Sequence, residues 1–365
     1  MKRFKKAGII LASIIALIAA SVYIIFQLPQ FGGSLPGNRL ERFQQSPQFI
    51  HGRFENTPPQ QTDLSLFNNL KLYSQGQIRE PQFAVPVVQL EANTLKNPPG
   101  QGLRTIWLGH ATVLVEINGL RIMTDPVLSE VASPVPIGPH RLHPSPIALE
   151  ALSGIDAVVI SHDHYDHLDM KTIQHLASQG THFYVGLGVG AHLERWQVAQ
   201  QQIHEMDWWE PVQLKGVTII CTPARHYSGR KSMDNSTLWA SWLLQGGGYS
   251  LYFSGDTGYG EHFKQIRERF GAVDVSLMKV GAYGDTWLDI HMNPESAVQA
   301  QVDLGGKILL PVHWATFNLS YHAWDEPILR TLAAAKSKGI TIITPQVGEP
   351  FEMGKPFENK VWYKP

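Results

Sequence analysis

Short apolar runs separated by turn-forming residues fill the chain from Leu103 onward. Three of them, Thr105–Leu108, Thr112–Ile117 and Leu120–Thr124, have the length of short strands, and Asn118-Gly119 between the last two is typical of a two-residue hairpin turn. The same pattern predicts strands at Ile155–Ile160, Thr181–Gly186, Val217–Cys221, Trp239–Gln245, Tyr249–Ser254, Val273–Val280, Lys307–Val312 and Ile340–Thr344.

Helices are predicted between these strands. One is expected at Val189–Ala199 and another at Glu326–Lys338. Between them, Asn293 is expected to cap a helix that has Pro294 in its first turn and ends near Gly305. Because strands and helices alternate in two blocks, the pattern predicts an α/β fold in which two sheets pack together with helices outside.

The amino-terminal residues carry a different pattern. Four bases within residues 1–6 precede an uncharged apolar stretch, residues 7–26, which as a helix would be about 30 Å long, the thickness of membrane hydrocarbon. A cleaved signal peptide is the alternative, although its apolar core is usually shorter, about 7–15 residues. We therefore expect an uncleaved, single-pass transmembrane helix at residues 7–26, with residues 1–6 in the cytoplasm and the rest of the chain on the periplasmic or extracellular side.

Residues 27–100 are rich in Pro, Gln, Asn and Gly and show little periodicity. They are expected to form a linker and an amino-terminal extension, with one short helix at Asp63–Leu72. The segment is too long for a plain tether, so part of it is expected to pack on the domain formed by residues 101–365. Within that domain the proline-rich stretch Ser133–Pro146 is predicted to be a loop.

The composition narrows the classes of function. Of 365 residues, 43% are hydrophobic and 17% charged, which is typical of a globular protein. Beyond residue 26 there are 26 Lys and Arg against 31 Asp and Glu, and no basic run, so a nucleic-acid-binding surface is not expected. The single cysteine, Cys221, excludes an internal disulfide and a cysteine-based metal site.

A dense group of metal-ligand side chains follows the strand predicted at Ile155–Ile160. His162, His164, Asp166 and His167 lie within six residues of one another at its carboxyl end. In extended backbone His162 and His164 point the same way and can bind one ion, whereas Asp166 and His167 lie past the turn and can face a second. Imidazole and carboxylate suit zinc or, less selectively, manganese or iron. The alternative, a polar surface loop with chance histidines, is disfavoured by this density of ligands.

Three more ligand-type residues, His226, Asp256 and His313, each stand beyond the carboxyl end of a predicted strand, close to glycine or proline. Taken singly, such a residue is more often structural. The recurrence of one geometry after the first group favours a second set of metal ligands. Structural roles are assigned to other histidines: His110, His175, His192 and His204.

Several stretches within residues 51–350 carry a resemblance to a known family. They are Trp107-Leu108-Gly109-His110-Ala111-Thr112-Val113, Thr124-Asp125-Pro126, Ile160 through Asp169, Asp207-Trp208-Trp209-Glu210, Thr222-Pro223-Ala224-Arg225-His226, Ser254-Gly255-Asp256-Thr257-Gly258-Tyr259, Gly281-Ala282-Tyr283, His291-Met292-Asn293-Pro294-Glu295 and His313-Trp314-Ala315-Thr316-Phe317. The chain resembles the metallo-β-lactamase superfamily, whose signature is His-x-His-x-Asp-His with a later His, Asp and His. Within it, the resemblance is closest to N-acylphosphatidylethanolamine-hydrolysing phospholipase D and its bacterial relatives.

The resemblance implies an αββα sandwich that holds two zinc ions, or Mn²⁺ or Fe²⁺ in their place, at one edge between the sheets. The implied ligands of one ion are His162, His164 and His226, those of the other are Asp166, His167 and His313, and Asp256 bridges the two. The chain departs from the family at Asp163, where the phospholipase is expected to carry Asn. An acid there would be expected to alter metal affinity or the pH optimum.

Three residues are expected to be catalytic. Asp166 would orient the attacking nucleophile as well as bind a metal, and Asp256 would bridge the metals. His291 would contact the phosphate or the leaving oxygen; its alternative is a surface histidine that flanks a helix. Asp125, at a strand end, is expected to hydrogen-bond a ligand histidine.

The expected function is a membrane-anchored dinuclear zinc hydrolase of the phospholipase D type. It would cleave N-acylphosphatidylethanolamine or related phospholipids to phosphatidic acid and N-acylethanolamine. The expected partners are a membrane phospholipid as substrate and the lipid bilayer through the amino-terminal helix; a homodimer is left open. The first alternative is a zinc lactonase-type carbonyl hydrolase of a small soluble substrate. The second is a membrane-tethered protein with a structural metal, which the seven ligands disfavour because structural zinc takes four.

Overall fold

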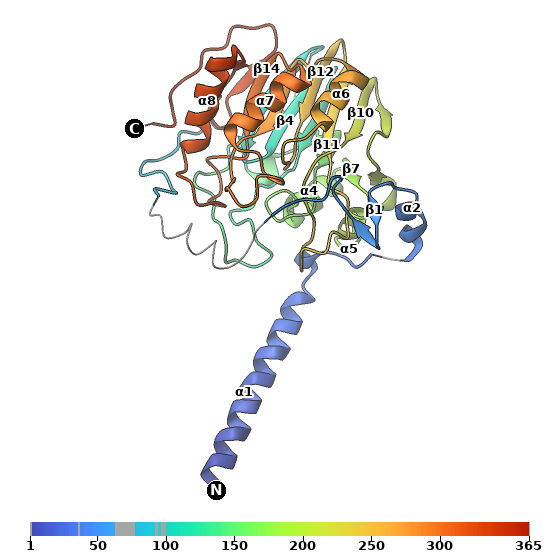
Figure 1. Ribbon diagram of the computed structural model, residues 1–365, viewed down its shortest axis with the longest axis vertical. Coiled ribbons are helices and arrows are strands. Elements are labelled where there is room, and N and C mark those ends of the chain that lie inside the picture. The colour runs from blue at the N-terminus through green and yellow to red at the C-terminus, as the bar shows by residue number, and fades with distance from the viewer. Residues whose placement is uncertain (1, 36, 63–76, 92–93, 96–99, 365) are drawn as a thin grey trace.

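Two β-sheets stacked face to face form the body of the molecule, and helices cover both outer faces (Figure 1). The computed structural model describes residues 2–35, 37–62, 77–91, 94–95 and 100–364. The first seven-stranded sheet has the order β16-β3-β4-β5-β6-β7-β8 and the second has the order β15-β14-β13-β12-β11-β10-β9. This is the αββα sandwich that the resemblance implied, so that part of the predicted fold class is confirmed.

The strands of the first sheet are β3 (Leu103–Gly109), β4 (Thr112–Ile117), β5 (Leu120–Thr124), β6 (Ala157–Ile160), β7 (His182–Gly186), β8 (Ile203–Met206) and β16 (Pro350–Glu352). Those of the second sheet are β9 (Pro211–Leu214), β10 (Val217–Thr222), β11 (Ser241–Gly246), β12 (Tyr249–Phe253), β13 (Val275–Lys279), β14 (Ile308–Val312) and β15 (Thr341–Ile342). A small separate hairpin joins β1 (Phe49–Ile50) to β2 (Arg53–Phe54).

The helices of the domain are α4 (Met170–Ser178), α5 (Gly190–Arg195), α6 (His262–Phe270), α7 (Pro294–Leu304) and α8 (Glu326–Lys338). Before the domain come α1 (Lys2–Phe26), α2 (Leu40–Gln44) and the 3₁₀ turns η1 (Pro29–Phe31) and η2 (Gly37–Arg39). Two further 3₁₀ turns are η3 (Leu149–Ala151) and η4 (Gln200–Gln202).

The alternation of side chains along β4 shows why these sequences form a double layer. Val113 and Val115 belong to the same buried cluster as Trp242 and Leu244 of the second sheet, whereas Leu114 belongs to the cluster that includes residues of α4 and α5. Successive residues of a strand point to opposite faces, and both faces of this strand are covered. Strands buried on both faces are mostly apolar, as β4 is apart from Thr112 and Glu116.

Most element positions were predicted from the sequence. Strands β4 and β5 and helix α8 have the predicted bounds, and the side chain of Asn293 caps α7 by accepting a hydrogen bond of 2.9 Å from the amide of Ser296. The turn between β4 and β5 has positive φ at both Asn118 and Gly119, as a type I′ hairpin requires. The helix predicted at Val189–Ala199 is shorter, because the chain leaves the helical conformation at Gln197, where φ is 68°. The helix predicted at Asp63–Leu72 lies outside the described residues.

The amino-terminal segment requires a correction. Helix α1 forms over residues 2–26, but none of the helices in the described part of the chain is long and apolar enough to cross a membrane. This finding overturns the predicted transmembrane helix and the single-pass localisation, with its cytoplasmic amino terminus, that was based on it.

Residues between α1 and the first sheet contact the domain. Phe43 of α2 and Phe54 of β2 are buried together with Leu187, Leu238 and Trp239 of the domain. This places the segment beside the carboxyl ends of β7 and β10, whereas the division of the chain at residue 100 stays a prediction.

The buried ring of His143 predicts a loss of stability in acid. Burial, and next the charge of Arg141, lower the pKa of His143 to about 4, against about 6.5 for an unfolded histidine. Between these values the unfolded chain binds more protons, so the stability that is fully present above about pH 6.5 falls as the pH falls toward 4. At pH 5 the loss from this one ring is about 2 kcal/mol. His143→Gln, which cannot titrate, should reduce the drop in unfolding free energy between pH 7 and pH 5 by that amount in urea denaturation. An unchanged drop would contradict the assignment.

Candidate metal centre

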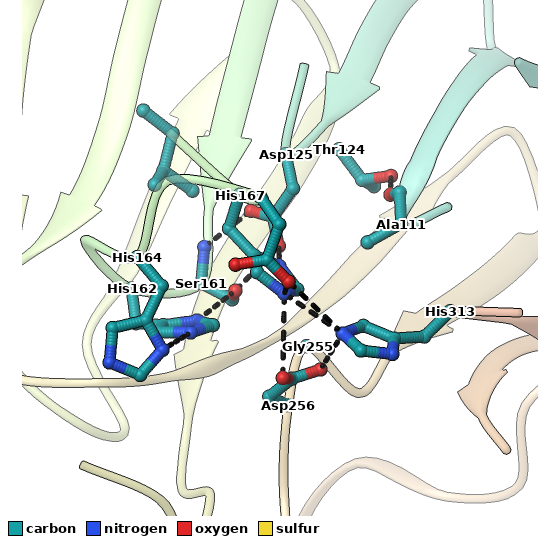
Figure 2. Close-up of polar contacts among 12 residues, drawn as sticks. Ala111, Thr124, Asp125, Ser161, His162, His164, His167, Gly255, Asp256 and His313 are labelled. Atoms are coloured by element: carbon teal, nitrogen blue, oxygen red, sulfur yellow. Dashed lines mark hydrogen bonds and ion pairs between the residues drawn. The ribbon is translucent and has the colours of Figure 1, made fainter. Parts of the chain in front are cut away.

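The predicted ligands gather at one edge of the sandwich, where strands of both sheets end, and Figure 2 shows five of them: His162, His164, His167, Asp256 and His313. Strands β5 and β6 run parallel, as do β12, β13 and β14, so their carboxyl ends meet at this edge. The ligands come from the loops that follow β6, β10, β12 and β14: His162, His164, Asp166, His167, His226, Asp256 and His313. All of them are buried except His164 and Asp166, which are partly buried.

One cluster joins Asp166, His167 and His313 to the carboxylate of Asp256. The Nε2 atoms of His167 and His313 are 3.2 Å apart and lie 3.3 and 3.5 Å from Oδ2 of Asp166. Nε2 of His167 lies 3.4 Å from Oδ2 of Asp256, and Nε2 of His313 lies 3.1 Å from its Oδ1. Four ligands at ~2.0–2.1 Å around a tetrahedral ion are about 3.3 Å from one another, so these atoms already have the spacing that a zinc ion requires.

The other cluster joins three imidazoles. Nδ1 of His164 lies 2.8 Å from Nε2 of His162 and 3.3 Å from Nε2 of His226. The remaining nitrogens of two rings have partners: Nδ1 of His162 donates to Ser161 Oγ at 2.8 Å, and Nδ1 of His226 donates to the carbonyl of Ile290 at 3.1 Å. In the neutral ring this leaves a lone pair on each Nε2, so lone pairs converge on one point, as they do around a cation.

The carboxylate of Asp256 lies between the two clusters. Besides the contacts with His167 and His313, its Oδ2 is 3.9 Å from Nε2 of His226 in the histidine cluster. Its Oδ1 is buried and accepts no hydrogen bond from any described residue, although His313 Nε2 is only 3.1 Å away. A buried carboxylate oxygen without a hydrogen bond is costly, and a shared cation would satisfy it.

The protonation states also fit a metal centre. Burial lowers the pKa of His226 to about 3 and that of His162 well below its ordinary value, so both rings are neutral at pH 7. Burial alone would raise the pKa of Asp256, but the neighbouring His313 and His167 hold it well below the usual range. Neutral imidazoles and ionised carboxylates are the forms that bind metal.

His167 is the exception among the rings. Burial lowers its pKa, but the carboxylates of Asp256 and Asp166 outweigh that effect and raise it well above the ordinary value. The ring therefore lies where negative charge is most concentrated, and this is the charge that a bound cation would neutralise.

Asp125 orients one histidine of each cluster. Its Oδ2 accepts a hydrogen bond of 2.6 Å from Nδ1 of His167 and one of 2.5 Å from Ser161 Oγ. Ser161 in turn accepts from Nδ1 of His162, so one buried carboxylate fixes the ring of His167 directly and that of His162 through a hydroxyl. Orienting partners of this kind set which ring nitrogen faces a metal.

His291 and Tyr227 lie beside the clusters. Nε2 of His291 is 3.7 Å from Oδ2 of Asp256, and the side chain is 14% exposed. Burial, and then the positive charge of Lys279, lower the pKa of His291 well below its ordinary value. The ring of Tyr227 lies 4.5 Å from that of His164 and 4.6 Å from that of His226. Sequence reasoning did not single out Tyr227, because nothing in its local pattern distinguishes it from a surface aromatic residue.

Asp163 faces away from the clusters. Its Oδ2 lies 3.2 Å from Nε2 of His192, and its Oδ1 accepts from the amide of Gly229 at 2.8 Å. His192 also accepts through Nδ1 from the amide of Gly33, at 3.1 Å. The acid at this position therefore ties the metal-binding loop, through His192, to the segment that follows α1, and acts on the ligand His164 through its charge.

His110, assigned a structural role from the sequence, lies in the cluster of Asp166, His167 and His313, which we call the second cluster. It forms one candidate metal-binding group with Asp166, His167 and His313. Its Nε2 is 2.9 Å from Oδ2 of Asp166, and burial lowers its pKa to about 3. One feature of the sequence could have identified His110: it lies in the tight turn between two predicted strands, within the stretch Trp107–Val113.

Two cavities adjoin the loops around the centre. One, of about 460 Å³, is lined by residues of the proline-rich loop from Ser133 to Pro136 together with Tyr165 and Arg230. The other, of about 670 Å³, is lined by Pro58 and Pro59, by Trp208 and Trp209 and by Arg225. Arg225 directly precedes His226, so the second cavity lies against a loop of the centre.

Comparisons with known proteins agree with this geometry. A family model described as a beta-lactamase superfamily domain matches residues 120–314. The chain is 34% identical over 274 residues to N-acyl-phosphatidylethanolamine-hydrolyzing phospholipase D 1 of Caenorhabditis elegans, covering 69% of this chain and 76% of that protein. It is 43% identical over 328 residues to an uncharacterized protein of Mycobacterium tuberculosis, covering 88% of each.

Among solved structures, the fold is similar to the metallo hydrolase Igni18 from Ignicoccus hospitalis, with a TM-score of 0.53 and 22% identity over 71% of this chain and all of that one. It is also similar to isothiocyanate hydrolase from Delia radicum gut bacteria, with a TM-score of 0.55 and 19% identity over 68% of this chain and 99% of that one. These two likenesses concern the fold alone.

The contrast between Asp125 and Asp163 gives a prediction. Asp125→Ala removes the acceptor that orients His167 and should weaken metal binding by about 10–100-fold. Asp163→Asn should change metal affinity much less, because that side chain hydrogen-bonds His192 and Gly229 and acts on the ligand His164 only through its charge. Competition of each variant with a chromophoric chelator measures the difference. Equal metal affinities of Asp125→Ala and wild type would show that the orienting bond has no role.

Proposed function

Because the chain belongs to the beta-lactamase superfamily and has the fold of its metallo-hydrolases, we propose that it is a dinuclear zinc hydrolase of the phospholipase D type. Its substrate is N-acylphosphatidylethanolamine or a related phospholipid, and its products are phosphatidic acid and an N-acylethanolamine. The observation that carries the proposal is the placement of Asp256 between two clusters of ligand atoms.

Each cluster offers a complete set of protein ligands for one ion. His162, His164 and His226 would hold the first, and Asp166, His167 and His313 the second. Asp256, whose carboxylate lies between the clusters, would contribute a ligand to both ions. Two zinc ions bound in this way supply Lewis acidity: they lower the pKa of a water and accept negative charge that develops on the substrate.

The other residues of the centre position the reacting groups. Asp125 keeps Nδ1 of His167 as the donor, so that Nε2 faces the cluster. Asp166 is partly exposed and would orient the attacking nucleophile from its side of the centre. His291, on the side of Asp256 and the histidine cluster, would contact the phosphate or the leaving oxygen.

The phospholipid substrate is supported by the relatives and by the cavities. The phospholipase D of Caenorhabditis elegans resembles this chain over most of its length. The larger cavity brings together proline and tryptophan side chains from segments that are distant in sequence, Pro58-Pro59 and Trp208-Trp209. Acyl chains need apolar surface near the centre when the head group reaches the metals.

Metal content and two variants test the dinuclear centre. The wild-type protein should contain two zinc ions per chain by elemental analysis. Asp256→Asn should weaken both sites and His162→Ala only one, and each should lower activity by more than ~100-fold, since even loss of an orienting partner costs 10–100-fold. His175→Ala, which alters a histidine bonded to the carbonyl of Leu152 far from the centre, is the matched control. One ion per chain in active wild-type protein would exclude the dinuclear proposal.

The substrate is tested with labelled water. Protein in detergent should convert N-acylphosphatidylethanolamine to phosphatidic acid, and in water enriched in heavy oxygen the label should appear on phosphorus. A panel of lactones serves as the comparison, because the same ligand set can act on a carbonyl carbon. Opening of lactones without turnover of the phospholipid would replace the proposal with a lactonase.

A further inference from the structure

His110 is a buried imidazole in the metal centre to which the proposed ligand sets give no role. Its ring is 1% exposed and its centroid lies 3.9 Å from that of His313. Nε2 is 2.9 Å from Oδ2 of Asp166, the shortest contact that this carboxylate makes among the described residues. The ring therefore lies beside the second cluster and reaches one of its ligands.

The backbone of His110 is held so that the ring keeps this place. Its φ of 52° is in the left-handed region, which is uncommon for residues other than glycine. Its amide donates to Thr316 Oγ1 at 2.6 Å, and its carbonyl accepts from Trp107 Nε1 at 2.8 Å and from the amide of His313 at 2.9 Å. A strained conformation persists only where its surroundings fix it, and here three hydrogen bonds do so.

The direction of the hydrogen bond between His110 and Asp166 follows from the chemistry of the carboxylate. An ionised carboxylate only accepts hydrogen bonds, so Nε2 of His110 carries the proton that points at Asp166. The bond constrains the same oxygen that lies 3.3 Å from Nε2 of His167. A side chain in a loop, partly exposed, needs such a constraint to present a fixed oxygen to an ion.

The other ligands have comparable partners. Nδ1 of His167 donates to Asp125, and Nδ1 of His226 donates to the carbonyl of Ile290. Among the described residues, His110 is the only one outside the proposed ligand sets that contacts the carboxylate of Asp166.

We propose that His110 is a positioning residue that donates a hydrogen bond to Asp166 and fixes this carboxylate as a ligand of the second ion. The inference rests on the proposed function, because it takes Asp166 as a metal ligand. It assigns His110 to the metal centre without making it a ligand itself.

Three variants test the assignment. His110→Ala removes the donor, and His110→Gln replaces it with an amide that can still donate. His143→Ala is the matched control, because His143 is also buried and its Nε2 lies 3.0 Å from the Thr316 hydroxyl that accepts the His110 amide, but it makes no contact with the clusters. Zinc affinity is measured by competition with a chromophoric chelator, and melting temperature with and without zinc.

His110→Ala should bind one of its two zinc ions about 10–100-fold more weakly and the other as wild type does. His110→Gln should recover part of the lost affinity. His143→Ala should lower the melting temperature equally with and without zinc and leave both affinities unchanged, as a purely structural residue does.

Three results separate the outcomes. Unchanged zinc affinities in His110→Ala, with an equal loss of melting temperature in both forms, would overturn the inference and return His110 to a structural role. Complete loss of one ion from both His110→Ala and His110→Gln would also overturn the inference, because His110 would then be a metal ligand and not a positioning residue. Wild-type protein that binds no metal would instead remove the proposed function on which the inference rests.

Discussion

The carboxylate of Asp256 is buried where imidazoles from both clusters converge, and the arrangement of the centre depends on how its charge is compensated. An ionised carboxylate in the interior is destabilising unless it is paired. Here its neighbours are imidazoles, and two of these rings, His162 and His226, direct a lone pair inward because their other nitrogen already donates elsewhere. A cation on each side of Asp256 would satisfy the carboxylate and both sets of rings together.

The double sheet provides the rigidity that this arrangement needs. Neighbouring parallel strands in each sheet bring their carboxyl ends to a single edge. The hydrophobic core shared by the two sheets fixes the position of one sheet relative to the other. Each ligand comes from a short loop whose first residues continue a buried strand. Asp125 and His110 then add hydrogen bonds between loops that belong to different strands, so ligand positions are coupled across the first sheet.

Local pattern was sufficient to predict much of this fold, because strands buried on both faces are apolar and their ligands follow at the carboxyl ends. The position of Asp256 was predicted in this way, as was the hairpin at Asn118. His110 was missed because its partner, Asp166, is 56 residues away, and only the folded first sheet brings the two together. The partner of Asp163 was not predicted for the same reason, since His192 is 29 residues away on another element, and the expected effect of this acid on metal affinity or the pH optimum stays a prediction. The apolar stretch at the amino terminus correctly predicted a helix, but apolarity alone did not establish a membrane span.

Anomalous X-ray diffraction at the zinc edge, from crystals of the zinc-loaded protein, tests the central claim most directly. The account predicts two strong peaks per chain. One should lie among His162, His164 and His226 and the other among Asp166, His167 and His313, with the carboxylate of Asp256 between them. A single peak, or two peaks neither of which contacts Asp256, would contradict it.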